Sequence, residues 1–267
     1  MTPEKVMNKR IADILEEKYR LFHCVDFVAT DPISIPKSYS KKQDIEITAF
    51  WTAILSWGNR KTIINSAQNL FGRMGASPHD FIMNHTEKDR QIFEDFKHRT
   101  FQYPDTLCFL DFLQRHYQTY ESLEDAFVPE VLDPLHPMKS RLIHFYDRFF
   151  DHPNALDRTK KHIANPAKGS TCKRLNMMMR WMVRPAEARV DFGLWRNIST
   201  EELMIPLDVH VERVTRKLGI LTAKKANWDA VEELTSYLRI LDPQDPVKYD
   251  FALFGMGVME KDGLDLL

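Results

Sequence analysis

The sequence predicts an all-α protein, and three observations support this prediction. Apolar residues recur three to five positions apart through most of the chain. Prolines and residues such as Ser, Thr, Asp and Asn stand where these runs begin, as they do at helix starts. No stretch alternates apolar and polar residues in the way that a half-buried strand does. With 43% apolar residues in 267, the chain can fill a substantial core.

The N-terminal part is expected to form one amphipathic helix and then an irregular connection. Pro3 suits the first position of the helix, and Thr2 is its expected cap. The segment 31–40 contains two prolines, which withhold backbone donors and bias the preceding residues away from helix. This segment is therefore a candidate crossing between two lobes.

The segment 44–57 is apolar on almost every side, which is typical of a helix buried at a domain centre. Residues 57–60 interrupt it with a polar tip. A second helix, 61–74, follows with apolar residues at helical spacing. The sequence thus predicts two consecutive helices joined at a polar turn.

The remaining helices are predicted from their start and stop signals. Caps or first-turn prolines open them, and Gly219 is expected to end one of them. The expected starts are Ser77, Thr86, Pro104, His136, Lys173, Asp208, Asn227 and Asp245.

Composition excludes several classes of protein. Three widely spaced cysteines in no CxxC pattern argue against a disulfide framework and against a zinc or iron-sulfur site. The start of the chain lacks the apolar core of a signal peptide, and no run of about 18 apolar residues occurs. We therefore expect a cytoplasmic protein with no membrane partner.

A local basic stretch is hidden by the formal net charge of −1. Residues 158–186 contain eight Lys or Arg and no Asp or Glu. A charge run is often only a solvated face. This one coincides with a polar turn, 168–172, and a helix start, whose backbone N–H groups also attract anions. It is a candidate phosphate-binding surface.

Lys173 stands at the start of a mostly apolar helix. Burial and the positive end of the helix dipole both disfavour a charged ammonium, so the amine could act as a nucleophile. The neighbouring Arg174 acts in the same direction. Taken alone, such a lysine is more often a surface or phosphate contact.

Asp208 directly precedes an amphipathic helix, where an aspartate is usually the N-cap. A capping carboxylate is held in place and kept ionised, so capping does not exclude catalysis. A metal site built from Asp208, His210 and Glu212 is disfavoured, because on a helix only Asp208 and Glu212 share a face. Cys172 lacks a His/Asn setting that would activate it.

Two strings resemble the helix-hairpin-helix DNA glycosylases of the endonuclease III superfamily. They are Gly169-Ser170-Thr171-Cys172-Lys173 and Pro206-Leu207-Asp208-Val209-His210-Val211-Glu212-Arg213-Val214. More narrowly, the chain resembles a little-characterised bacterial branch related to the archaeal 8-oxoguanine glycosylases. The resemblance implies a two-lobed helix-hairpin-helix fold with a central cleft. One lobe would span residues 42–186 and the other residues 1–41 plus 187–267.

The resemblance also implies a function. Lys173 would attack C1′ of a damaged nucleotide, and Asp208 would assist it. The chain would then be a bifunctional DNA glycosylase/AP lyase that excises an oxidised purine, with 8-oxoguanine the favoured base, through a lysine Schiff base. The implied partner is double-stranded DNA containing a damaged base, bound by a monomer associated with the bacterial nucleoid.

Binding residues follow from the same resemblance. The implied DNA contacts are Lys168, Gly169, Ser170, Thr171, Arg174, Trp57, Asn59 and Arg60. The implied walls of the base pocket are Met177, Arg180, Trp181 and Phe254. The chain departs from the family pattern in having Thr171 in place of a second glycine, which argues against a hairpin-bound monovalent cation. No four-cysteine cluster follows the last helix, so neither an iron-sulfur cofactor nor any other metal is expected.

Two other functions remain open from the sequence. The chain could be a non-catalytic helix-hairpin-helix protein that binds nucleic acid. It could also be a metal-dependent hydrolase that uses Asp208 and Glu212. The segment 184–204, which lengthens the spacing between Lys173 and Asp208, has the character of an insertion.

Overall fold

A computed structural model describes residues 3–259 and divides the chain into two compact units. One unit contains residues 1–27 and 168–267, and the other contains residues 28–167. The sequence had indicated a boundary near residue 186, whereas this division falls between Ala167 and Lys168. As a result, Lys173 and Asp208 belong to the same unit. The expected cap Thr2 lies outside the described residues.

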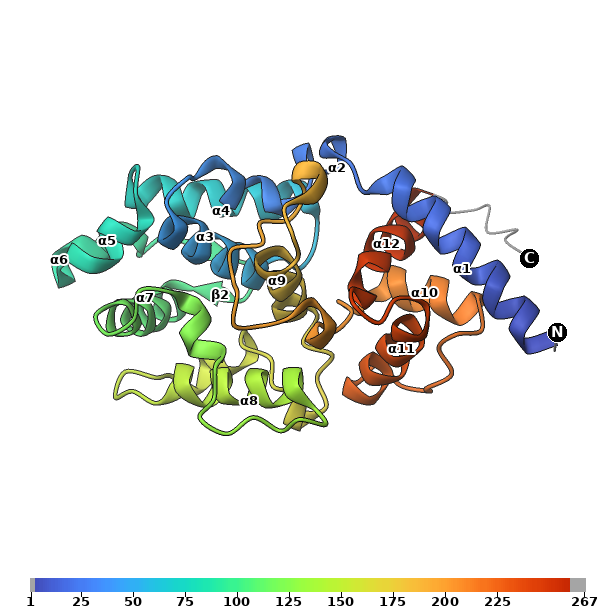
Figure 1. Cartoon of the computed structure of the whole chain (residues 1–267). Coiled ribbons are helices and arrows are strands. Elements are labelled where there is room, and N and C mark those ends of the chain that lie inside the picture. Colours follow the sequence, from blue (N-terminus) through green and yellow to red (C-terminus); the bar gives the residue numbers. More distant parts are fainter. Residues whose placement is uncertain (1–2, 260–267) are drawn as a thin grey trace. The chain divides into compact units, whose positions relative to one another are not determined.

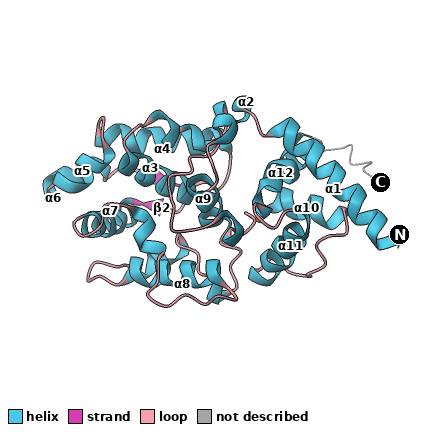
Figure 2. Cartoon of the chain, viewed as in Figure 1, coloured by secondary structure: helices cyan, strands magenta, loops and turns pink. Residues whose placement is uncertain are grey.

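Within the described residues the fold is all-α apart from one short hairpin (Figure 2). The hairpin pairs β1 (Lys97–His98) with β2 (Phe101–Gln102) in antiparallel register. Two-residue strands are too short to show an alternating pattern, which is why the sequence did not indicate them. Arg99, in the turn between them, adopts a left-handed conformation with φ 56°.

The unit of residues 28–167 is built around the helix that the sequence indicated as its centre. In α3 (Lys42–Leu55), every residue from Asp44 to Leu55 is buried. Glu46 is fully buried in this helix and accepts hydrogen bonds from the Tyr117 hydroxyl at 3.0 Å and from the backbone N–H of Leu123 at 3.0 Å. The other helices are α4 (Arg60–Met74), α5 (Pro78–Asn84), α6 (Glu87–Arg90), α7 (Tyr103–Tyr117) and α8 (Pro137–Phe150).

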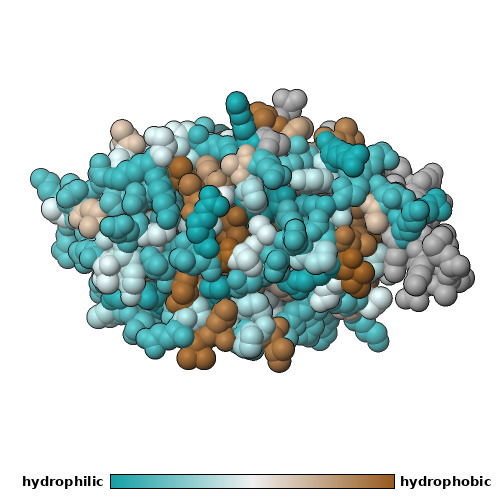
Figure 3. Space-filling model, in the orientation of Figure 1, coloured by the Kyte–Doolittle hydropathy of each residue, from teal (hydrophilic) through white to brown (hydrophobic). Residues whose placement is uncertain are grey.

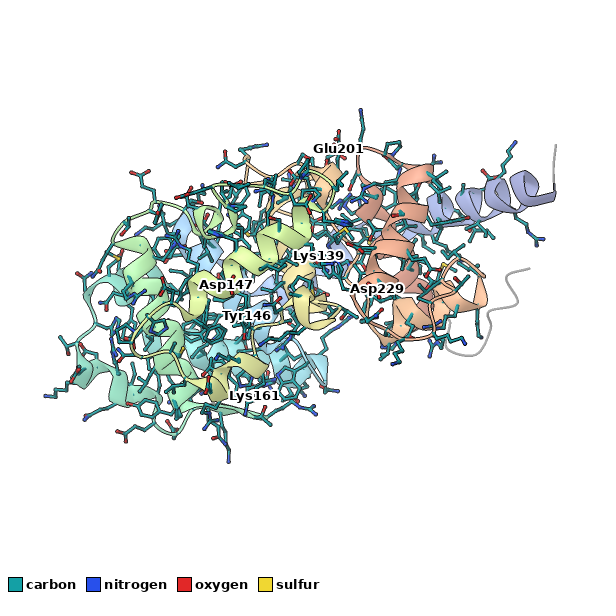
Figure 4. The ribbon with its side chains drawn as sticks, turned by 90° about the horizontal axis from the view of Figure 1, so that it is seen from below. Lys139, Tyr146, Asp147, Lys161, Glu201 and Asp229 are labelled. Atoms are coloured by element: carbon teal, nitrogen blue, oxygen red, sulfur yellow. The ribbon has the colours of Figure 1, made fainter. Side chains whose placement is uncertain are left out.

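The N-caps expected at two short helices of this unit are confirmed. The Ser77 side chain accepts from the backbone N–H of Asp80 at the start of α5. Thr86 and Asp89 form a capping box at the start of α6. Lys139, Tyr146 and Asp147 lie along α8 (Figure 4).

The other unit joins the two ends of the described chain. It contains α1 (Pro3–Phe22), α9 (Lys173–Val183), α10 (Val209–Lys217), α11 (Trp228–Leu241) and α12 (Asp250–Met259). Figure 1 shows α1 running alongside α12. A side-chain carbon added at Gly255 would come within 2.2 Å of the Phe22 ring, so this glycine allows the close approach of the two helices. The short α2 (Val25–Ala29) follows α1.

The segment 184–204 folds back on the C-terminal end of α9. The backbone N–H groups of Phe192 and Leu194 donate to the carbonyls of Trp181 and Met182, at 2.8 Å in both cases. Trp195 is only 1% exposed. Val190 and Trp195 of this segment therefore belong to the core of their unit, whereas residues 185–187 are exposed.

The visible face of the molecule is mostly hydrophilic, with apolar side chains in small separate patches (Figure 3). No helix among the described residues combines the length and the apolarity needed to cross a membrane.

Candidate functional site

The two candidate catalytic residues occupy the starts of two helices in one unit. Lys173 is the first residue of α9, and Asp208 is the N-cap of α10. Both side chains are partly exposed. A residue that the sequence did not single out, Asp250, is the first residue of α12. It interacts electrostatically with both Lys173 and Asp208.

Asp208 is a cap, as its position in the sequence indicated. Its Oδ1 atom accepts hydrogen bonds from the backbone N–H groups of His210, at 2.9 Å, and Val211, at 3.0 Å. These two donors hold the carboxylate at the positive end of α10, where negative charge is favoured. The carboxylate is therefore fixed in place and forms no ion pair with any described cation within 4 Å.

The turn before Lys173 is built from local hydrogen bonds. Gly169 adopts a left-handed conformation with φ 75°, and Cys172, the N-cap of α9, adopts another with φ 49°. The Ser170 hydroxyl accepts from the backbone N–H of Cys172 at 3.2 Å, and the Thr171 carbonyl accepts from the Asn176 side chain at 3.1 Å. The helix α9 therefore begins without a side-chain cap. The hydrogen bonds of the turn fix the backbone that leads into its first residue, Lys173.

The Lys173 side chain is partly exposed. It forms no hydrogen bond and no ion pair among residues 3–259. Its thiol neighbour is inert, because Cys172 is 1% exposed and burial raises the pKa of that thiol to about 12. On the other side, burial lowers the pKa of Arg174 to about 10.

Asp250 is buried, at 5% exposed, and pairs with the Arg180 guanidinium of α9. Burial raises the pKa of Asp250 to about 6; the cations Arg180 and Lys173 lower it, and the neighbouring Asp208 carboxylate raises it further. An ordinary aspartate titrates near pH 4. The pKa of Asp250 thus lies closer to neutral pH than that of an ordinary aspartate.

A larger network of buried charge surrounds Arg180. Its Nε atom lies 3.5 Å from Asp191, which also pairs with Arg184 at 2.5 Å. Arg184 pairs in turn with Asp245 at 2.8 Å. Burial alone would lower the pKa of Arg184, but Asp191 and Asp245 outweigh burial and raise it. These ion pairs join α9, the 184–204 segment and the start of α12.

Ion pairs neutralise part of the positive charge of the basic stretch 158–186. Four of its eight cations form ion pairs with carboxylates outside the stretch, and they are Arg158, Lys160, Arg180 and Arg184. Lys161, labelled in Figure 4, is exposed and forms no ion pair with a described residue. Lys168 and Gly169 are exposed as well, and Arg174 is partly exposed.

The residues proposed for a base pocket divide into two groups. Met177 and Phe254 are partly exposed, and the Phe254 ring meets the His210 ring edge-on at 5.8 Å between centroids. Arg180 is engaged with Asp250, and Trp181 is 0% exposed. In this structure the last two are therefore core residues. Their role in a pocket stays a prediction.

The residues of the polar tip, Trp57, Asn59 and Arg60, belong to the other unit. Asn59 caps α4 by accepting from the backbone N–H of Thr62 at 3.3 Å. The Arg99 guanidinium lies over the Trp57 ring, 4.6 Å from its centroid. The tip is thus an ordered cap with a cation–π contact, and DNA contact by these residues stays a prediction.

The polar residues near Asp208 have local partners. The His210 ring lies 3.2 Å from the Gly257 carbonyl, and Glu212 pairs with Arg216 at 2.9 Å. Among the described residues no group of three or more His, Cys, Asp or Glu side chains is placed to hold a metal ion.

Sequence reasoning missed Asp250 because it was counted with the apolar helix that it opens. A signal was present: Asp250 is the only charged residue in the ten-residue helix Asp250–Met259. A single carboxylate at the head of such an apolar helix must be paired or neutral when buried.

A family model described as "Protein of unknown function (DUF2400)" matches residues 31–259. No curated protein matches the chain, and no solved structure does. The assignment to the helix-hairpin-helix glycosylase family was therefore wrong. The two strings on which it rested contain a glycine turn before one helix and an aspartate cap before another, and these features arise wherever helices begin.

Proposed function

The chain belongs to the DUF2400 family of unknown function, and from its own charge cluster we propose that it is a lysine-dependent DNA glycosylase/AP lyase. One observation carries the proposal: a lysine that bonds to no residue among 3–259 and a capped carboxylate start two helices of one unit, and both interact electrostatically with the same buried Asp250. This is the pair of groups that a Schiff-base mechanism at a sugar carbon requires.

Each residue has a distinct role in the proposed reaction. As the bond between base and sugar breaks, positive charge develops on the sugar, and the fixed Asp208 carboxylate stabilises it. The neutral Lys173 amine attacks C1′ and forms a Schiff base. Loss of a proton from C2′ then eliminates the 3′ phosphate, which cuts the strand. Water would replace the lysine in an enzyme without strand cleavage.

The proposed substrate is double-stranded DNA with an oxidised purine, and 8-oxoguanine is the first base to test. The exposed Lys168 and the turn 169–171 would hold phosphate groups beside Lys173. A flipped nucleotide would then present its C1′ atom to the amine. The two units would be the two lobes of the enzyme.

Borohydride trapping on duplexes that carry 8-oxoguanine, other oxidised bases or an abasic site tests the proposal. The wild-type chain is expected to form a covalent adduct and to cut the strand, and Lys173→Gln is expected to abolish both. Lys88→Gln, which removes an exposed lysine of the other unit outside the basic stretch, is the matched control. If wild-type protein binds these duplexes but never traps or cuts them, the chain is a nucleic-acid-binding protein and the proposal fails.

A further inference from the structure

We propose that the loop 222–227, which leads into α11, is a second DNA-backbone contact of this unit, and that Lys224 and Lys225 bind phosphate groups there. The loop is bonded to the turn 168–172, which precedes Lys173. The inference rests on the proposed function, because it takes double-stranded DNA as the partner. It adds to the binding surface two residues that the sequence motifs did not single out.

One backbone hydrogen bond joins the loop to the turn. The N–H group of Trp228, the first residue of α11, donates to the Gly169 carbonyl at 3.3 Å. Lys225 stands three residues before Trp228, so its Cα atom lies at most about 11 Å from that of Trp228, even in an extended chain. A hydrogen bond of 3.1 Å from the Asn227 N–H to the Lys225 carbonyl turns the chain and shortens this span. Lys225 therefore lies near the turn, with Lys224 next to it in the chain.

The charges of the two lysines are not compensated within the described chain. Lys224 and Lys225 are exposed, and neither forms a hydrogen bond or an ion pair with any residue among 3–259. From residue 217 to residue 228 the sequence contains no Asp or Glu. Two adjacent ammonium groups without a carboxylate partner create a local positive potential, which attracts an anionic ligand.

Carboxylates of α11 order the loop without pairing with its lysines. Glu233 accepts hydrogen bonds from the backbone N–H groups of Thr222, at 2.6 Å, and Ala223, at 3.0 Å. Asp229, labelled in Figure 4, accepts from the Asn227 side chain at 2.9 Å. These bonds fix the backbone directly before the two lysines and the cap directly after them. The loop is thus held in place while both ammonium groups stay exposed.

The turn on the other side of the Trp228 bond offers donors of a second kind. Gly169 has a left-handed backbone with φ 75°, and the backbone N–H groups of Ser170 and Thr171 donate to no residue among 3–259. Consecutive N–H groups next to a left-handed residue form a concavity that binds anions. Two bonded segments therefore present backbone donors and ammonium groups near the start of α9.

This arrangement fits the DNA backbone better than a single anion. A duplex carries one negative charge per about 1.7 Å of its axis, so a surface about 11 Å long faces about six phosphate groups. Separate donors on two neighbouring segments match such a row of charges. Backbone contacts carry no base specificity. Lys224 and Lys225 are therefore expected to strengthen the binding of any duplex, damaged or undamaged.

Fluorescence anisotropy with an undamaged duplex across a salt series tests the inference. The double variant Lys224→Gln/Lys225→Gln is expected to reduce the slope of log K against log salt by about 1.8 and to weaken binding about 10- to 100-fold at 0.1 M salt. Lys9→Gln/Arg10→Gln is the matched control: it removes an adjacent pair of exposed cations from α1 of the same unit, and wild-type binding is expected. Equal slopes for the two double variants would overturn the inference.

Borohydride trapping of the same proteins on abasic DNA separates this inference from the proposed function. The Lys224→Gln/Lys225→Gln protein is expected to trap at the wild-type rate on saturating DNA, because these lysines bind the substrate and do not react with it. If wild type traps and the salt slope of this variant is unchanged, the inference alone is wrong. If wild type binds through the two lysines and never traps, the proposed function alone is wrong. Absence of any duplex binding at low salt would overturn both.

Discussion

Arg180 and Asp250 form a buried ion pair that ties α9 to the first residue of α12. The Asp250 carboxyl group also interacts electrostatically with Lys173 and with Asp208. A buried charge with its partner removed is strongly unfavourable. Removal of either partner is therefore expected to destabilise the contact between α9 and α12.

The close approach of α10 and α12 gives a first prediction. Gly257→Ala would place a carbon 2.8 Å from the His210 Cβ atom, so we expect a loss of about 1–3 kcal/mol in the free energy of unfolding. Gly72→Ala, in α4, is the control: no atom lies within 4 Å of the added carbon, and a stability gain of about 0.5–1 kcal/mol is expected from helix propensity. Urea unfolding measures both. Equal effects of the two substitutions would contradict the packing described here.

Buried His116 predicts a pH dependence of stability. Burial lowers the pKa of His116 to about 4, and its ring bonds to the Ser122 carbonyl at 2.8 Å. In the unfolded chain a histidine titrates near pH 6.5, so the unfolded state binds more protons between these values. The stability that neutral His116 contributes is complete above about pH 6.5 and is lost as the pH falls toward 4. The free energy of unfolding changes through this group by at most about 1.4 kcal/mol per pH unit.

His116→Gln is the variant that checks this dependence. It removes the titrating ring and keeps a side-chain donor for the Ser122 carbonyl. The slope of unfolding free energy against pH between 4 and 6.5 is expected to decrease in this variant. A wild-type slope in His116→Gln would show that the group responsible lies elsewhere.

Ion pairing within the basic stretch predicts unequal contributions to DNA affinity. Lys161 forms no ion pair with a described residue, whereas Lys160 pairs with Asp157 at 2.6 Å. Lys161→Gln is expected to weaken binding of any duplex and to reduce the slope of log K against log salt by about 1. Lys160→Gln is expected to change the slope less. Fluorescence anisotropy across a salt series would decide, and identical slopes for the two variants and wild type would contradict this expectation.

The fold class and most helix starts could be predicted from the sequence because they depend on local chemistry. The α3 helix was recognisable from its continuous apolar run, and the caps Ser77 and Asp208 from their residue types. The β1–β2 hairpin was missed because its strands are two residues long. Helix starts are marked by capping residues and prolines, whereas strands of two residues are too short to show an alternating pattern.

The site was only partly predictable, because it combines residues that are far apart in the sequence. Lys173 and Asp208 were recognisable one at a time, from a helix start and a cap. Asp250 was not, because its importance comes from Arg180, seventy residues earlier in the chain. Ion pairing also removes half of the basic stretch from any anion-binding surface. Partners so distant in sequence cannot be assigned from spacing.

Mass spectrometry of the trapped adduct tests the central claim most directly. The protein would be reduced with borohydride on DNA containing an abasic site and digested, and the residue carrying the sugar remnant would be identified. The adduct is expected on Lys173 and, in the Asp208→Asn variant, in strongly reduced yield. A remnant on another lysine, or no remnant at all on a duplex that the protein binds, would contradict the account.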